Sequence, residues 1–224
     1  MQEAKRAAAR AALQELPAEG VVGLGSGSTA CIFVEELARF LAGRRHITGV
    51  PTSETTRALA TRLGIPLLDD VGPWTLDVSV DGADEVSAKL DLIKGGGGAH
   101  AREKIINHAS RRNVIIVDGS KLSGRLGEKH SVPIEILPFA HGTTREHLAG
   151  YGVPTLRMRD GKPARTDAGN LLCDLSVKPL DDPAALDRVL RSIPGVVETG
   201  LFVGRADVVL VADERGVQRL VPIG

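Results

Sequence analysis

The stretch that decides the fold is "GVVGLGSGSTACIFVEEL", residues 20–37. It opens with a short apolar run, turns through a segment rich in glycine and serine, and continues with apolar residues at helical spacing, including Ile32, Phe33 and Leu37. This order predicts a buried strand, a tight turn and an amphipathic helix, which together form the repeating unit of an α/β fold.

The same order recurs along the first half of the chain. "HITGVPTS" leads into the helical pattern "ETTRALATRLG", and "TLDVSV" alternates apolar with polar residues. "NVIIV" is a continuous apolar run of the kind found in central parallel strands. Strands that alternate with helices predict a Rossmann-like, mostly parallel sheet with helices on both faces.

The pattern changes near residue 128. From there, a strand and a helix are predicted by "SVPIEIL" and "HGTTREHLAGYG", two strands by "VPTLRMR" and "NLLCDLSV", and a final helix and strand by "DPAALDRVLRSI" and "VVETGLF". This βαββαβ order is that of a ferredoxin-like α+β domain. The closing pair "ADVVLVAD" and "VQRLVPI" is expected to return to the first sheet. We therefore predict an α/β domain at 1–127 and 203–224, interrupted by an inserted ferredoxin-like domain at 128–202.

Composition excludes several classes of function. The chain is 42% hydrophobic and 25% charged with a net charge of zero, which is ordinary for a globular protein and favours neither nucleic-acid nor membrane partners. Aromatic residues make up only 3%, so platforms for stacking bases are not expected. Cys31 and Cys173 form no CxxC pair, which is typical of small buried residues in a reducing compartment.

The N-terminal segment "MQEAKRAAARAALQEL" reads as an amphipathic helix without the apolar core of a signal peptide. No apolar run approaches the ~20 residues of a membrane span. We expect a cytoplasmic protein. The six histidines show neither HxH nor HExxH spacing, so we read them as surface or structural residues and predict no metal.

Ligands of open α/β sheets bind beyond the carboxyl ends of the strands, and four stretches fall at such ends. The first is "GLGSGSTA", whose backbone N–H groups and hydroxyls suit an anion or phosphate. The candidate residues are Gly25, Ser26, Gly27, Ser28 and Thr29. A dinucleotide is disfavoured because a serine replaces the third fingerprint glycine and no acidic residue ends the next strand. A purely structural turn would also explain the glycines.

The second stretch is "SVDGADEV", in which Asp81 and Asp84 follow a strand. Two carboxylates there indicate acid/base or sugar-hydroxyl contacts, although Asp-Gly turn chemistry and a helix cap explain them as well. The fourth stretch is "VDGSK", where Lys121 either binds a phosphate or is simply solvated.

The third stretch is "LIKGGGGAHAREKI", residues 92–105. Lys94 ends a short strand, and the glycines that follow, Gly95, Gly96 and Gly97 among them, allow a ligand to approach the backbone closely. Glu103 then falls in the first turn of a predicted helix, where the helix dipole favours its ionised form. Glu103 is either a general base or a glutamate that merely suits the helix start.

Together these strings resemble the ribose-5-phosphate isomerase family of the A type, as do "TDAGNLLCD" and "IPGVVETGLF". Members of the family interconvert ribose 5-phosphate and ribulose 5-phosphate in the pentose phosphate pathway, without a metal or an organic cofactor. The resemblance therefore implies a small sugar-phosphate substrate, no cofactor, and a homodimer or homotetramer.

The resemblance also implies roles for the candidate residues. Glu103 matches the general base that moves a proton between C1 and C2. Asp81, Asp84 and Lys94 match residues that handle ring opening and the substrate oxygens. The phosphate-binding set is matched by Ser28, Thr29, Lys121 and, in a looser alignment, Lys5. One departure is His100-Ala101, which stands where many relatives carry an apolar residue and a threonine; it leaves the packing of the glycine loop open.

Three rival functions stay open at this point. The first is a non-catalytic sugar-phosphate sensor, which would keep the phosphate loops but would not need Glu103, Lys94 and the paired aspartates. The chain shows no helix-turn-helix segment or basic region for reading DNA, which argues against a repressor. The second rival is a CoA transferase with a glutamate nucleophile, and the third is an amino-sugar phosphate deaminase.

Overall fold

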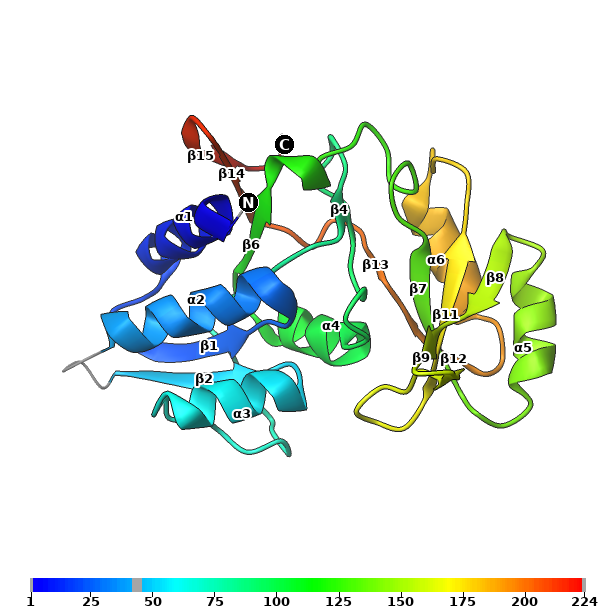
Figure 1. Ribbon diagram of the computed structural model, residues 1–224, viewed down its shortest axis with the longest axis horizontal. Coiled ribbons are helices and arrows are strands. Elements are labelled where there is room, and N and C mark those ends of the chain that lie inside the picture. Colours follow the sequence, from blue (N-terminus) through cyan, green and yellow to red (C-terminus); the bar gives the residue numbers. More distant parts are fainter. Residues whose placement is uncertain (1, 42–45, 223–224) are drawn as a thin grey trace. The chain divides into compact units, whose positions relative to one another are not determined.

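The computed structural model describes residues 2–41 and 46–222, which fall into two compact units (Figure 1). The first unit comprises Met1–Ala83, Arg102–Lys121 and Arg205–Gly224. The second comprises Asp84–Ala101 and Leu122–Gly204. The predicted boundaries, 1–127 and 203–224 against 128–202, differ from this division because residues 84–101, 122–127 and 203–204 group with the second unit.

The first unit is built on a six-stranded sheet in the order β15-β14-β6-β3-β1-β2. Its strands are β1 (Gly20–Leu24), β2 (Ile47–Pro51), β3 (Val78–Asp81), β6 (Asn113–Asp118), β14 (Val208–Asp213) and β15 (Gly216–Leu220). Neighbouring strands are parallel except for β14 and β15, which form an antiparallel pair at the edge. The predicted mostly parallel α/β sheet is confirmed, including the return of the last two strands to it.

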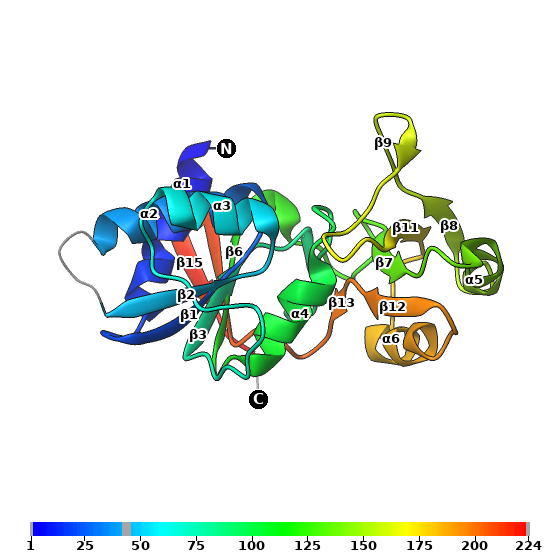
Figure 2. The same ribbon diagram turned by 90° about the horizontal axis from the view of Figure 1, so that it is seen from below.

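Helices cover both faces of this sheet (Figure 2). On one face lie α1 (Gln2–Ala12), α2 (Gly27–Phe40) and α3 (Glu54–Arg62), whose apolar side chains share one core with alternate residues of β1, β3, β6 and β14. On the other face, α4 (His100–Ala109) packs Ile106 against Val50 and Leu76. The alternation of side chains along each strand supplies both cores, since successive residues point to opposite faces.

The second unit contains the predicted βαββαβ motif. Its elements are β7 (Val132–Ile136), α5 (His141–Leu148), β8 (Val153–Leu156), β11 (Leu171–Ser176), α6 (Pro183–Arg191) and β12 (Val196–Thr199). The strands form an antiparallel sheet in the order β12-β7-β11-β8, and both helices pack on one face of it. A short hairpin of β9 (Met158–Arg159) and β10 (Lys162–Pro163) lies within the segment that joins β8 to β11.

A three-stranded sheet explains why residues 84–101 group with the second unit. It consists of β4 (Glu85–Val86), β5 (Leu92–Ile93) and β13 (Leu201–Phe202). The fully buried Glu85 carboxylate also accepts four backbone hydrogen bonds of 3.1–3.2 Å from the loop at residues 127–130. Burial of an ionised carboxylate is costly unless hydrogen bonds replace its water, so this contact fixes the loop beside β4.

None of the helices within the described ranges is both long enough and apolar enough to span a membrane.

An arginine cluster attaches α1 to α2. The buried Glu36 of α2 accepts hydrogen bonds from Arg6 (3.0 Å) and Arg10 (3.0 Å) of α1 and from Arg39 (2.7 Å) of its own helix. Burial alone would raise the pKa of Glu36, but these guanidinium groups outweigh it and hold the pKa below its usual range. Since α1 carries Lys5, the cluster also fixes the position of that lysine.

We expect Glu36→Gln to lower the free energy of unfolding at pH 7 by about 1–2 kcal/mol, a value reduced because the arginines are partly exposed. Because the pKa of Glu36 is lower in the folded protein than in the unfolded chain, its ionised carboxylate stabilises the fold at pH values above the unfolded-state pKa of about 4.3. This stabilisation is lost as the pH falls through the folded-state pKa. Urea unfolding should therefore separate the variant from the parent at pH 7, and the difference should shrink as the pH is lowered below about 4.3. Glu3→Gln, at an exposed position of α1, is the control and should leave the free energy of unfolding unchanged. A loss of unfolding free energy in Glu36→Gln that is the same at every pH would contradict the prediction.

Candidate active site

The first glycine loop, residues 25–27, follows β1 and is anchored by Asp81 at the end of β3. The N–H groups of Ser26 and Gly82 both donate to Oδ1 of Asp81, at 3.0 and 2.7 Å. A Cβ atom on Gly25 would lie 2.1 Å from the same oxygen, so only glycine allows the loop to approach this closely. Asp81, predicted as a site residue, therefore holds the first glycine loop in place.

Two threonines support the loop from the side of α3. Thr56 donates its hydroxyl to the carbonyl oxygen of Gly25 at 2.9 Å, and the hydroxyl of Thr52 bonds that of Ser26. Ser26 is the N-cap residue of α2, and its side chain does not cap the N–H groups that open the helix. These groups keep the partial positive charge that favours anions at a helix start.

Lys5, Ser28 and Lys121 gather at the carboxyl edge of the first sheet. Lys5 donates to Oγ of Ser28 at 2.8 Å, and Lys121 ends the short 3-10 helix Gly119–Lys121 that follows β6. Burial would raise the pKa of Asp118, but hydrogen bonds from Ser120 and the charges of Lys121 and Lys5 hold it below its usual range. Both ammonium groups thus act on one carboxylate, and the predicted phosphate-binding cations share one location.

Glu103 lies in the first turn of α4 with only 6% of its surface exposed. Helical spacing puts it on the same side of α4 as Asn107, which is also buried and donates to the carbonyl oxygen of Arg205 at 3.1 Å.

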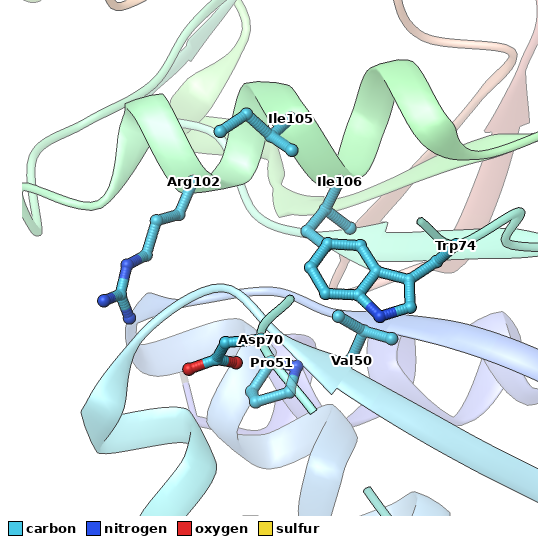
Figure 3. A pocket seen from close by; sticks show the side chains of 7 residues that line it. All are labelled: Val50, Pro51, Asp70, Trp74, Arg102, Ile105 and Ile106. Atoms are coloured by element: carbon cyan, nitrogen blue, oxygen red, sulfur yellow. The ribbon is translucent and has the colours of Figure 1, made fainter. Parts of the chain in front are cut away.

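The opposite side of α4 borders a separate cavity of about 220 Å³ (Figure 3). It is lined by Val50, Pro51, Asp70, Trp74, Arg102, Ile105 and Ile106. Its walls are largely apolar, and its Arg102 is paired with Glu54 at 2.8 Å. None of the predicted site residues lines this cavity, so it is not the predicted phosphate site.

The second unit contains the second glycine loop, residues 95–98. Asp84 anchors it as Asp81 anchors the first glycine loop. The N–H of Asp84 bonds the carbonyl oxygen of Ile93 at 2.8 Å, which ties it to β5. Oδ2 of Asp84 accepts the N–H of Gly96 at 2.7 Å. Asp84 and Gly96, both predicted as site residues, are therefore in direct contact.

Lys94 is 4% exposed and lies at the end of β5. Its N–H bonds the carbonyl oxygen of Gly200 at 2.9 Å, and its Nζ lies 5.4 Å from the centre of the Phe202 ring. An ammonium group over a ring face is held by a cation–π interaction. The charge of Lys94 is thereby kept at the edge of the glycine loop.

His100, the departure from the expected motif, is a packing residue. It is fully buried, and its Nε2 hydrogen-bonds the carbonyl oxygen of Glu198 at 3.2 Å. Gly95 has φ +107°, and a Cβ there would lie 2.6 Å from Nδ1 of His100. The imidazole thus fills the space beneath the first glycine of the loop.

Sequence reasoning missed several residues that shape these loops. Asp118 stood in the quoted "VDGSK" string, so its position after a strand was a usable signal. Glu85 stands in the quoted "SVDGADEV" string, where nothing local distinguishes it from Asp84. Arg157 contacts the second glycine loop from a distant part of the chain and is paired with Asp174, and no local pattern marks either residue.

The described residues hold no group of three or more histidine, cysteine, aspartate or glutamate side chains suited to a metal ion. Both cysteines are free. Cys173 is buried as predicted, whereas Cys31 is partly exposed. Burial raises the pKa of the Cys173 thiol to about 11, which keeps it in the unreactive protonated form at neutral pH.

The first unit is thus an α/β unit with an anchored glycine loop and lysines at the carboxyl ends of its strands, and the second unit carries a glycine loop anchored by a carboxylate. Residues 48–216 match the profile of the family described as ribose 5-phosphate isomerase A (phosphoriboisomerase A). The ribose-5-phosphate isomerase A of Chloroflexus aurantiacus is 48% identical, over 97% of this chain and 93% of that protein. The Caulobacter vibrioides protein of the same name is 46% identical over 97% of each chain. This chain belongs to the ribose 5-phosphate isomerase A family.

Solved structures agree with this assignment. Ribose 5-phosphate isomerase A from Methanocaldococcus jannaschii matches with a TM-score of 0.92 and 38% identity, over 98% of each chain. A D-ribose-5-phosphate isomerase in complex with phospho-erythronic acid matches with a TM-score of 0.94 and 39% identity, also over 98% of each chain. The predicted fold class and family are therefore both confirmed.

We expect Gly25→Ala to weaken binding of ribose 5-phosphate at least tenfold, about 1.4 kcal/mol, because the added methyl group overlaps Asp81 and displaces the Ser26 N–H. Isothermal titration calorimetry measures the change. Gly142→Ala at the start of α5 is the control, since an added Cβ there meets nothing within 4 Å. Equal affinities of Gly25→Ala and the parent would show that the loop geometry does not matter for binding.

Proposed function

We propose that this protein interconverts D-ribose 5-phosphate and D-ribulose 5-phosphate, an aldose–ketose isomerisation. The observation that carries the proposal is its identity of 48% with a ribose-5-phosphate isomerase A over nearly the full length of both chains. A similar solved protein is described in complex with phospho-erythronic acid, which supports a phosphorylated ligand of this size.

Glu103 is proposed as the general base. The hydrogen on the carbon next to a carbonyl is hard to remove because negative charge builds on the oxygen. A carboxylate can take it from one carbon and return it to the neighbouring carbon through an enediolate, and such a base contributes about 10²–10⁴-fold. The buried position of Glu103 in a helix start supports this role, since it is fixed and shielded from water.

Lys94 and the N–H groups of the second glycine loop are proposed to stabilise the enediolate. Donors that are fixed before the reaction need no reorganisation when charge appears, and one such donor is typically worth about 3 kcal/mol. The cation–π contact that holds Lys94 and the bond from Gly96 to Asp84 support this rigidity. Asp81 and Asp84 are proposed to exchange protons with substrate hydroxyls during ring opening, in addition to anchoring the loops.

The phosphate is proposed to bind at the first glycine loop. The donors are Ser28, Thr29, Lys121 and Lys5, together with the N–H groups that open α2. The bond from Lys5 to Ser28 and the combined effect of Lys5 and Lys121 on Asp118 support this set. A phosphate held far from the reacting carbons supplies binding energy that positions them.

Finer features of the proposal come from the family resemblance. They are catalysis without a metal or organic cofactor, a place in the pentose phosphate pathway, a cytoplasmic location, and assembly as a homodimer or homotetramer.

The direct test is conversion of ribose 5-phosphate by the purified protein with and without a chelator. We expect equal rates in both. A sugar-phosphate sensor would bind ribose 5-phosphate without turnover, a CoA transferase would become covalently labelled by an acyl-CoA, and a deaminase would release ammonia from an amino-sugar phosphate. Any of these outcomes without isomerisation would overturn the proposal.

We expect Glu103→Gln to lower kcat at least 10³-fold, in line with loss of a general base, while ribose 5-phosphate binding stays within a few-fold. Steady-state kinetics and calorimetry measure the two quantities. Glu54→Gln is the matched control, because Glu54 contacts Arg102, the residue before Glu103, and lies outside the proposed site. Near-normal turnover by Glu103→Gln would remove Glu103 from its role.

We expect Lys121→Ala to raise KM for ribose 5-phosphate about tenfold or more with a smaller effect on kcat, since a charge-assisted contact to phosphate is worth about 1.5–3 kcal/mol. Lys89→Ala, which removes an exposed lysine in the second unit, is the control. An unchanged KM for Lys121→Ala would count against its place in the phosphate-binding set.

A further inference from the structure

Arg157 reaches the second glycine loop from the segment between β8 and β9. Its Nη1 donates to the carbonyl oxygens of both Gly95 and Gly96, each at 3.0 Å. Its own backbone is fixed by hydrogen bonds with Leu172 and Ala164, both at 2.8 Å. The guanidinium is therefore anchored in the second unit and is directed at two successive peptide groups of the loop.

Asp174 sets the direction of this guanidinium. Nε of Arg157 donates to Oδ2 of Asp174 at 2.8 Å, and Nη2 pairs with Oδ1. Asp174 lies in β11, which pairs with both β7 and β8 and so cannot move independently of the sheet. A bidentate carboxylate fixes the plane of a guanidinium, which leaves Nη1 as the nitrogen that serves the loop.

These bonds determine where the loop N–H groups point. The peptide between Gly95 and Gly96 is held at both ends, its carbonyl by Arg157 and its N–H by Asp84. The next peptide has its carbonyl on Arg157, and because a trans peptide directs C=O and N–H to opposite sides, the N–H of Gly97 points away from the guanidinium. Gly97 itself borders open space, since an added Cβ would meet no atom within 4 Å.

We propose that the Arg157–Asp174 pair is a positioning device that aims the Gly97 N–H of the second glycine loop at the developing enediolate oxygen. The guanidinium charge at the carbonyl ends also polarises these peptides, which makes their N–H groups stronger donors. The inference rests on the proposed isomerisation and adds two residues to it. Arg157 acts through the loop rather than on the substrate.

The test is the kinetics of Arg157→Ala and Arg157→Lys. Misaligned oxyanion donors act on the transition state, so kcat should fall about 10- to 100-fold while KM for ribose 5-phosphate stays within about threefold. Guanidinium at millimolar concentration should restore part of kcat in Arg157→Ala. Arg157→Lys keeps the positive charge but lacks the planar guanidinium that bonds Asp174 and the loop together, so its kcat should remain low.

Arg165→Ala is the matched control, because this nearby arginine donates to the carbonyl oxygen of Gly169 and not to the glycine loop. It should leave kcat within twofold. Asp174→Asn should impair kcat in the same way as Arg157→Ala, and the double variant should lose little more than either single variant, as coupled residues do. Full kcat in a folded Arg157→Ala or Arg157→Lys variant would overturn the proposal, as would a loss that tracks a lower Tm and shows no rescue.

Failure of the proposed function can be told apart from failure of this inference. An inactive parent protein would remove the isomerase assignment. The positioning of the loop is then still tested by amide hydrogen exchange, in which Arg157→Ala should lose protection at Gly96 and Gly98 relative to Arg165→Ala. Unchanged exchange at both glycines would contradict a positioning role whatever the activity of the parent.

Discussion

The structure depends on carboxylates that accept backbone N–H groups from glycine-containing loops. Asp81 holds the loop after β1, Asp84 holds the loop after β5, and Glu85 holds the segment at 127–130. Glycine-rich segments lose much entropy on ordering, and charge-assisted hydrogen bonds are strong enough to offset that loss. Three acids within five residues thus order three loops that are far apart in the sequence.

This constraint explains how loops that contain glycine can be rigid enough for chemistry. A donor must be fixed closely if it is to stabilise charge in a transition state, and supporting residues provide that precision. In the first unit the support comes from Asp81, Thr52 and Thr56. In the second unit it comes from Asp84 and the buried His100, together with the pair of Arg157 and Asp174.

Local sequence predicted the parts of the fold that follow from short-range patterns. The strand-turn-helix order around residues 20–37, the βαββαβ motif and the glycine loops at strand ends all have such patterns, and each lies where it was expected. The predicted domain boundary at residue 128 differs from the division into compact units because β4 and β5 are two-residue strands that carry no periodicity. Arg157 could not be found for another reason: its partners Gly95 and Gly96 lie about sixty residues away, and only the folded sheet brings them together.

The central claim is that a carboxylate moves a proton between C1 and C2 of a sugar phosphate bound by these loops. The most direct measurement is conversion of ribose 5-phosphate in D₂O with a chelator present, followed by NMR of the recovered sugars. The account predicts solvent deuterium at C1 of ribulose 5-phosphate and at C2 of recovered ribose 5-phosphate. It also predicts the same rate in D₂O with and without the chelator. Complete retention of the substrate hydrogen together with loss of activity on chelation would indicate metal-assisted hydride transfer and would contradict it.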